Sequence, residues 1–246
     1  MKASGMRNAE PSMYLTNHLS RLQRSMSGVK VGVVIPTRNN RPAFLKQCLE
    51  YVKRQTHPVA QTVVVDYEQK TFPHDLAERY RFGFSQIKDC DLVFLIEDDD
   101  WYRADYIARM VERWEFHGRP DIYGINDSLY YHIFSQRYWH SKHPGRASAY
   151  STAIRPDAPL NWEALDPLWM DIGIWQQLKG VAEDLPHRIS VGIKHGIGDC
   201  GGVGHYPGFY ERRDPAGIGQ DSDYEQLREW MGNDLQFYLE RITKGA

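Results

Sequence analysis

The chain has 246 residues, of which 41% are hydrophobic, with a formal net charge of -2 and a pI of about 6.6. This length and composition can bury the core of one large domain. The near-neutral charge excludes a global basic field that would gather nucleic acid or an anionic membrane, although a local basic patch stays open. The three cysteines lack metal-type spacing, and no apolar run approaches the ~20 residues of a membrane span. We therefore expect a soluble, cytoplasmic protein.

The first part of the chain alternates between predicted strands and helices. Residues 1–28 are expected to form an N-terminal arm without chemistry, and strands are expected at 30–35, 61–66 and 91–96. Helices are expected to begin at Pro42 and Asp75, between these strands. This alternation is typical of βαβ units and predicts a parallel sheet.

An apolar run ends abruptly in four consecutive acids, Glu97, Asp98, Asp99 and Asp100. Crowded like charges disfavour ionisation unless a cation neutralises them, and hard oxygen ligands suit Mg²⁺ or Mn²⁺ bound together with a substrate's phosphates. The alternative is a solvated acidic turn that caps the following helix. Because ligands of open parallel sheets bind beyond the carboxyl ends of the strands, the acids, Arg38 and Asp66 are candidates for one site.

The order and spacing of three motifs resemble the nucleotide-binding half of family 2 glycosyltransferases of the GT-A fold. The motifs are Val-Val-Ile-Pro-Thr-Arg-Asn-Asn40, then Gln55-Thr56 before Val-Val-Val-Asp66, and finally Phe-Leu-Ile-Glu-Asp-Asp-Asp100. The resemblance implies an α/β GT-A fold with a Rossmann-like, mostly parallel sheet flanked by helices and a mixed acceptor-side half. It implies a single domain over 29–246, divided into a nucleotide-binding half, 29–115, and an acceptor-side half, 116–246.

The resemblance also implies roles for individual residues. A nucleotide, usually uridine diphosphate, would be held by Pro36, Thr37, Arg38 and Asp66. By register the family's Asp-any-Asp motif matches Glu97 and Asp99 as metal ligands, with Asp98 contacting the ribose or diphosphate. The chain departs from the family pattern at Glu97, where Asp is common, and at Tyr67-Glu-Gln-Lys70, which leaves the base and the sugar open. Arg79 and Arg81 could reach a diphosphate or could form a solvated helix face.

The second half is expected to hold the acceptor. A strand is predicted at 121–125, a hairpin at 129–139 whose aromatic residues favour a core over a sugar-stacking platform, and a strand at 189–193. Two helices are predicted, one with Asp166 as N-cap and Pro167 at its first position, and one at 221–244.

Asp171 is the candidate catalytic base. The predicted helix places it in the apolar face of Leu168, Ile172 and Trp175, and a carboxylate in such a face needs a reason. The resemblance implies a catalytic acid near the start of a helix here, and partial desolvation would make it a stronger proton acceptor. The alternative is an ion pair between Asp171 and an arginine.

The glycine-rich stretch 195–208 predicts a loop that closes over a phosphate or a sugar. Some GT-A enzymes supply a histidine from such a loop as a further metal ligand, and His195 and His205 are the candidates. Either can equally be a plain loop histidine.

The predicted function is a metal-dependent glycosyltransferase that moves a sugar from a nucleotide diphosphate donor, expected to be a UDP-sugar, to an acceptor hydroxyl with inversion, using Mn²⁺ or Mg²⁺. The acceptor would be a glycan or a small molecule. A nucleotidyltransferase and a non-catalytic sugar-binding or nucleic-acid-binding module are the alternatives. A modified DNA base as acceptor stays open because of a possible basic strip, Arg137, Lys142, His143 and Arg146.

Overall fold

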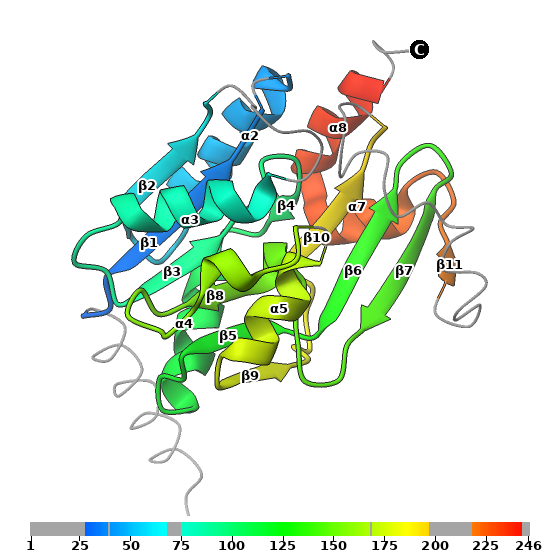
Figure 1. Ribbon diagram of the computed structural model, residues 1–246. Coiled ribbons are helices and arrows are strands. Elements are labelled where there is room, and N and C mark those ends of the chain that lie inside the picture. Colours follow the sequence, from blue (N-terminus) through cyan, green and yellow to red (C-terminus); the bar gives the residue numbers. More distant parts are fainter. Residues whose placement is uncertain (1–27, 39, 68–74, 168, 197–217, 243–246) are drawn as a thin grey trace, which may run out of the picture.

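The computed structural model describes residues 28–38, 40–67, 75–167, 169–196 and 218–242. The predicted arm, 1–28, lies almost wholly outside these residues. A six-stranded sheet runs through the first half of the fold (Figure 1). Its strand order is β2 (Val59–Val65), β1 (Val31–Pro36), β3 (Leu92–Leu95), β8 (Thr152–Ile154), β5 (Ile122–Ile125) and β9 (Gly180–Glu183). The sheet is mostly parallel, with β8 as its antiparallel strand.

Helices cover both faces of this sheet. Since side chains alternate along a strand, Val33 and Ile35 of β1 pack on the face with α2 (Pro42–Lys53) and α4 (Tyr106–Phe116), whereas Val34 packs on the opposite face. That opposite face carries α3 (Leu76–Gln86) and α5 (Met170–Gln177). The mixed α/β architecture with a mostly parallel, helix-flanked sheet is therefore confirmed.

A five-stranded mixed sheet forms the second half of the fold. Its order is β11 (Ile218–Gln220), β7 (Arg137–Lys142), β6 (Asp127–His132), β10 (Ser190–Lys194) and β4 (Trp101–Tyr102). The predicted hairpin is confirmed as β6 and β7, and its aromatic side chains are largely core: Tyr130, Tyr131 and Trp139 are buried, while Phe134 is 55% exposed.

The C-terminal segment packs on the same core as two helices, α7 (Glu225–Met231) and α8 (Leu235–Ile242). The prediction of one continuous helix over 221–244 is wrong. Gly232 has a positive φ of 57°, which favours glycine and interrupts the α-helical path between them.

A buried ion cluster holds the second sheet together. Asp127 at the start of β6 accepts hydrogen bonds from Arg188 Nη2 at 2.5 Å and from His140 Nδ1 of β7 at 3.0 Å. Burial alone would raise the pKa of Asp127, but these two partners outweigh it and lower the pKa to about 2. The ionised carboxylate thus stabilises the junction of three segments.

Among the described residues, none of the helices has the length and apolar character needed to span a bilayer.

Candidate functional site

The acidic run lies in the loop between β3 and β4, beyond the carboxyl end of β3. The loop is fixed at both ends, because the Ile96 N–H donates to the Val34 carbonyl at 3.1 Å and the Glu97 N–H donates to the Tyr102 hydroxyl at 3.0 Å. Asp100 Oδ1 also accepts the N–H of Ile193 in β10 at 2.8 Å. The loop therefore connects the two sheets.

Three of the four acids are buried. Asp98, Asp99 and Asp100 are only 3%, 2% and 1% exposed, and Glu97 is half-buried. The alternative of a solvated acidic turn is therefore wrong for these three residues. Burying several carboxylates together is costly unless cations compensate them, so the cluster needs a partner.

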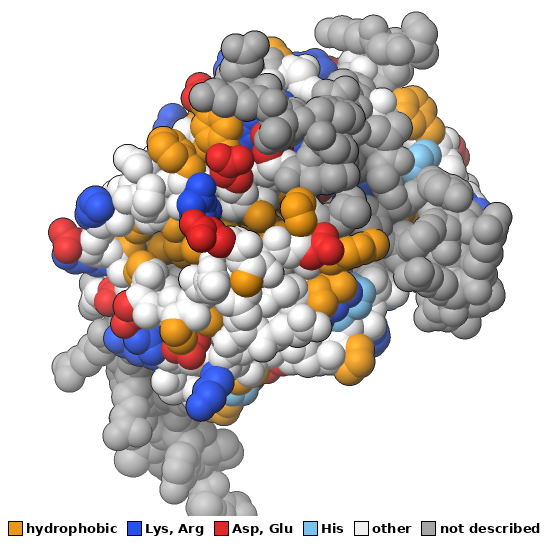
Figure 2. Space-filling view, in the orientation of Figure 1, with side chains coloured by type: hydrophobic (Ala, Val, Ile, Leu, Met, Phe, Trp, Pro, Cys, Tyr) orange, Lys and Arg blue, Asp and Glu red, His pale blue; other side chains and the backbone are white. Residues whose placement is uncertain are grey.

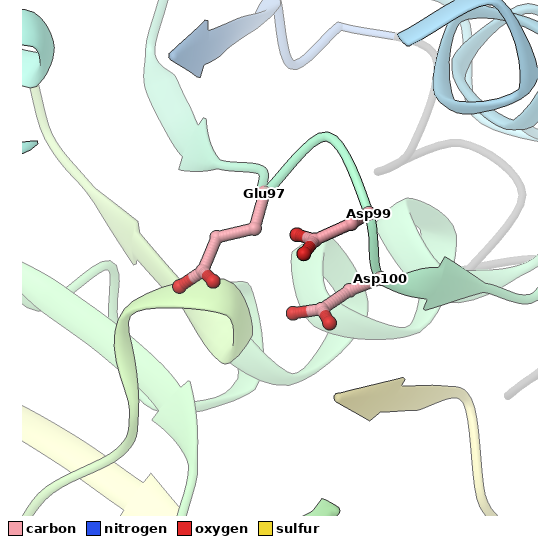
Figure 3. Close-up of side chains that lie close together, drawn as sticks. All are labelled: Glu97, Asp99 and Asp100. Carbon is pink, nitrogen blue, oxygen red and sulfur yellow. The ribbon is translucent and has the colours of Figure 1, made fainter. Parts of the chain in front are cut away.

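Three carboxylates converge on one point. One oxygen from each of Glu97, Asp99 and Asp100 lies within 4.8 Å of the others. Figure 3 shows Asp99 and Asp100 pointing from the loop toward Glu97. The motif register predicted Glu97 and Asp99 as metal ligands with Asp98 beside them, and the geometry adds Asp100 to the converging set.

Side chains from two other segments, Arg41 and His195, contact this cluster. Arg41, just before α2, donates from Nη2 to Asp98 Oδ1 at 2.6 Å and from Nη1 to Asp99 Oδ2. His195 is fully buried, lies with Nε2 3.0 Å from Asp99 Oδ2, and stacks on the Phe44 ring of α2 at 4.2 Å. In this structure His195 is thus a direct partner of Asp99.

The protonation behaviour of the acids follows from burial and from these partners. Burial raises the pKa of Glu97 to about 7 and that of Asp98 to about 6, and it raises the pKa of Asp100 well above its ordinary value. At Asp99 burial acts in the same direction, but the attraction of Arg41 outweighs it and holds the pKa well below its ordinary value. Burial of the four neighbouring acids therefore disfavours their ionised forms, and a further cation bound at the loop would stabilise those forms.

The donor set fits a divalent metal ion. Arg41, the buried Lys194 and, at Asp98, Arg38 act electrostatically on the four carboxylates, which outnumber these basic side chains. Asp100 Oδ2 is buried without a hydrogen-bond partner among the described residues. Clustered carboxylate oxygens are the ligands that Mg²⁺ and Mn²⁺ prefer.

The predicted nucleotide-binding loop is held by a buried arginine. Thr37 follows β1, and its N–H donates to the Val65 carbonyl at 2.9 Å. Arg79 of α3 is 1% exposed and donates to the Thr37 carbonyl at 2.7 Å and to Asp75 at 2.7 Å. Arg38 donates to the other oxygen of Asp75 at 2.7 Å. Arg79 thus has a structural role in this loop, and a diphosphate contact for it stays a prediction.

Two of the remaining predicted donor-side residues, Asp66 and Arg81, lie nearer the surface, whereas Pro36 is buried. Asp66 is exposed directly after β2, and Pro36 ends β1. Arg81 is 48% exposed in its side chain, lies 3.4 Å from Glu163, and lines a cavity of about 200 Å³ with Tyr67 and its α3 neighbours. Nucleotide contacts of these residues stay predictions.

Asp171 forms an ion pair, and its helix starts later than predicted. The helix α5 begins at Met170 rather than at Pro167, because Asp166 Oδ1 accepts the Trp169 N–H at 3.2 Å one turn earlier. Asp171 lies one turn before Ile174 and Trp175, two of the buried side chains of α5, so it shares a helix face with them. Asp171 is 22% exposed and pairs with Arg146 at 2.6 Å, as the alternative predicted.

Sequence reasoning missed Arg41, Lys194 and Asp75. Arg41 and Asp99 are 58 positions apart, so their contact depends on the sheet bringing the ends of β1 and β3 together. A signal was present, because a second cation, Arg41, stands at the end of the loop Pro36–Asn40 and four adjacent acids require counter-charges. His205 and the rest of the glycine-rich stretch beyond residue 196 lie outside the described residues.

Comparisons with known proteins give little beyond this geometry. No protein-family model and no curated protein matches the chain. Among solved structures, the crystal structure of S. aureus TarS 1-349 is similar, with a TM-score of 0.46 and 12% sequence identity over 66% of this chain and 60% of that chain. The similarity thus spans less than two thirds of the TarS chain, and at this TM-score it carries no argument about activity.

Proposed function

We propose that this protein is a metal-dependent glycosyltransferase that transfers a sugar from a nucleotide diphosphate donor, with uridine as the expected base, to an acceptor hydroxyl with inversion. The observation that carries the proposal is the buried acidic loop at the carboxyl end of β3, where oxygens of Glu97, Asp99 and Asp100 converge within 4.8 Å. Ligands bind at this edge of open α/β sheets.

The acidic loop would hold Mg²⁺ or Mn²⁺ through Glu97, Asp99 and Asp100. Bound there, such an ion neutralises the charge that develops on a diphosphate leaving group. Asp98 would contact the ribose or the diphosphate.

The loop after β1 and the acid after β2 would bind the nucleotide. Thr37 and Arg38 are preorganised by Arg79 and Asp75, so little ordering entropy is lost when the donor binds. Asp66 is exposed directly after β2 and would contact the base or the ribose. Both segments belong to neighbouring strands of one sheet, so one donor can contact both.

Asp171 would act as the general base toward the acceptor hydroxyl. Its ion pair with Arg146 is partly exposed, so an incoming acceptor can compete for the carboxylate. The pair also orients Asp171 before the acceptor arrives. A glycan or a small molecule is the expected acceptor.

Charge pairing weakens the case for a DNA acceptor. In the predicted basic strip, Arg146 pairs with Asp171, and Lys142 lies 3.6 Å from Asp184. On the described part of the face in Figure 2, basic and acidic side chains are interspersed. A nucleic-acid backbone needs uncompensated positive charge.

The proposal is tested by thermal shift with uridine diphosphate, with and without Mn²⁺, because a ligand that binds the folded state raises its apparent stability. We expect a shift in the wild type that requires Mn²⁺ and is lost in Glu97→Gln and Asp99→Asn. The matched control is Asp105→Asn, which removes a carboxylate that pairs with Arg103 at 2.5 Å outside the loop.

Two outcomes would contradict the proposal. A wild type without any metal-dependent shift from nucleotide diphosphates or nucleotide-sugars would remove its main support. A shift caused by nucleoside triphosphates and absent with nucleotide-sugars would favour a nucleotidyltransferase instead.

A further inference from the structure

Arg41 lies between two carboxylates of the acidic loop, in the place of a bound cation. Its guanidinium donates to Asp98 Oδ1 at 2.6 Å and to Asp99 Oδ2. We propose that Arg41 is an internal counter-cation that competes with a divalent metal ion for Asp99, and that its guanidinium moves to the donor's diphosphate when metal and donor bind together. The second half of this inference rests on the proposed function.

The backbone of Arg41 is fixed, whereas its side chain depends on the acids. The Arg41 carbonyl accepts the N–H groups of Phe44 and Leu45 at 3.0 Å and 3.2 Å, which anchors the residue at the start of α2. The side chain is 10% exposed and reaches across to the loop after β3. A change of rotamer can therefore move the guanidinium without moving the helix.

The guanidinium is only partly satisfied in this arrangement. Its Nε is buried and has no hydrogen-bond partner among the described residues, and Asp100 Oδ2 nearby in the same loop has none either. A buried donor without an acceptor is unfavourable, so this resting arrangement is strained. In the present arrangement each Nη of Arg41 donates to one carboxylate oxygen and Nε has no acceptor among the described residues. A diphosphate presents several oxygens and can accept hydrogen bonds from Nε and Nη together.

Competition with a metal follows from shared oxygens and like charge. Asp99 belongs both to the three converging carboxylates and to the pair that binds Arg41. A positive charge a few ångströms from the converging oxygens repels a divalent cation and occupies one of its ligands. Metal alone should therefore bind weakly, and metal and diphosphate should bind with positive coupling.

An arginine at the other end of α2, Arg54, provides a matched control. Arg54, just past the end of α2, donates to both oxygens of Asp234, from Nη1 at 2.7 Å and from Nη2. Like Arg41, Arg54 donates from two nitrogens to carboxylate oxygens, but its partner Asp234 lies outside the acidic loop.

The first experiment measures Mn²⁺ affinity without nucleotide, by titration calorimetry and by the spin resonance signal of free Mn²⁺. We expect Arg41→Met and Arg41→Gln to bind Mn²⁺ on the order of 10-fold more tightly than the wild type, because one competing charge is removed. Arg41→Lys keeps the charge and should stay near the wild type, as should Arg54→Met. Unchanged or weaker Mn²⁺ binding by folded Arg41→Met and Arg41→Gln proteins overturns the proposal.

The second experiment measures uridine diphosphate affinity at saturating Mn²⁺. We expect Arg41→Met and Arg41→Gln to bind it on the order of 10-fold more weakly than the wild type, through loss of a charge-assisted contact. Normal nucleotide affinity in both variants overturns the transfer of the guanidinium to the diphosphate. If the wild type binds no nucleotide diphosphate, the proposed function fails, and the Mn²⁺ titration still decides the competition by itself. Circular dichroism identifies any variant that does not fold. If either Arg41→Met or Arg41→Gln does not fold, the result with the other variant decides.

Discussion

Replacing Arg79 by methionine should destabilise the whole fold through the loop that carries the predicted nucleotide contacts. The side chain is 1% exposed and donates to Asp75 Oδ2 and to the carbonyls of Thr37, Val65 and Tyr67. Arg79→Met removes the guanidinium at similar volume, so the buried Asp75 oxygen and the three carbonyls lose this donor, although the Val65 carbonyl keeps the Thr37 N–H. Breaking a buried ion pair from one side costs about 3–5 kcal/mol.

The structure places the expected cost at the lower end of that range. Arg38 still donates to the other oxygen of Asp75 at 2.7 Å, so the carboxylate is not left wholly uncompensated. A loss of about 3 kcal/mol corresponds to a fall in Tm of roughly 6–12 °C for a chain of this size. Urea unfolding and differential scanning calorimetry measure both quantities.

The matched control lies two positions along the same helix. Arg81 is 48% exposed and lies 3.4 Å from Glu163, so Arg81→Met should cost less than about 1 kcal/mol. If Arg79→Met unfolds at the same temperature as Arg81→Met, the guanidinium of Arg79 does not hold the loop, and the reasoning is refuted.

Two further predictions concern the other half of the fold. The pKa of Asp127 is about 2 in the folded protein against an ordinary 3.8, so its ionised form contributes about 2 kcal/mol to the free energy of unfolding. This contribution is fully present above pH ~4 and is lost as the pH falls toward ~2. Urea unfolding should show a larger loss of stability between pH 5 and pH 2 in the wild type than in Asp127→Asn, and parallel pH dependences would contradict this. Asp171→Asn should keep Mn²⁺-dependent binding of uridine diphosphate and should change Tm little, since the side chains of its pair with Arg146 are partly exposed. The rate of sugar transfer should fall on the order of 10²-fold or more. Near-normal transfer would exclude Asp171 from catalysis.

The local part of this structure could be predicted from sequence because it follows from short-range patterns. The strand ending at Pro36, the helix beginning at Pro42 and the acids after the third strand depend on periodicity and on neighbouring residues. The choice of Glu97 and Asp99 came from the resemblance to a family motif, and their place at the edge of the sheet from the rule that ligands bind at the carboxyl ends of parallel strands.

The partners of those acids could not be predicted in the same way. Arg41 and His195 contact Asp99 across 58 and 96 positions, and only the packed sheets bring them together. One predicted helix start was wrong, since Asp166 accepts the Trp169 N–H but α5 begins only at Met170. A proline at 167 is compatible with both arrangements, and tertiary packing decided between them.

The attachment of the acidic loop to β10 limits how the two halves of this protein can be recombined. Asp100 accepts the N–H of Ile193 across 93 positions, and the two residues of β4 pair with β10 in the other sheet. A chimaera that exchanged everything after residue 115 for a related acceptor-side half would replace β10 and leave Asp100 and β4 facing foreign backbone. The smallest unit that can be transplanted is therefore the first sheet together with β10. A single crossover between residue 115 and β10 would separate the carboxylates from the strand that orients them.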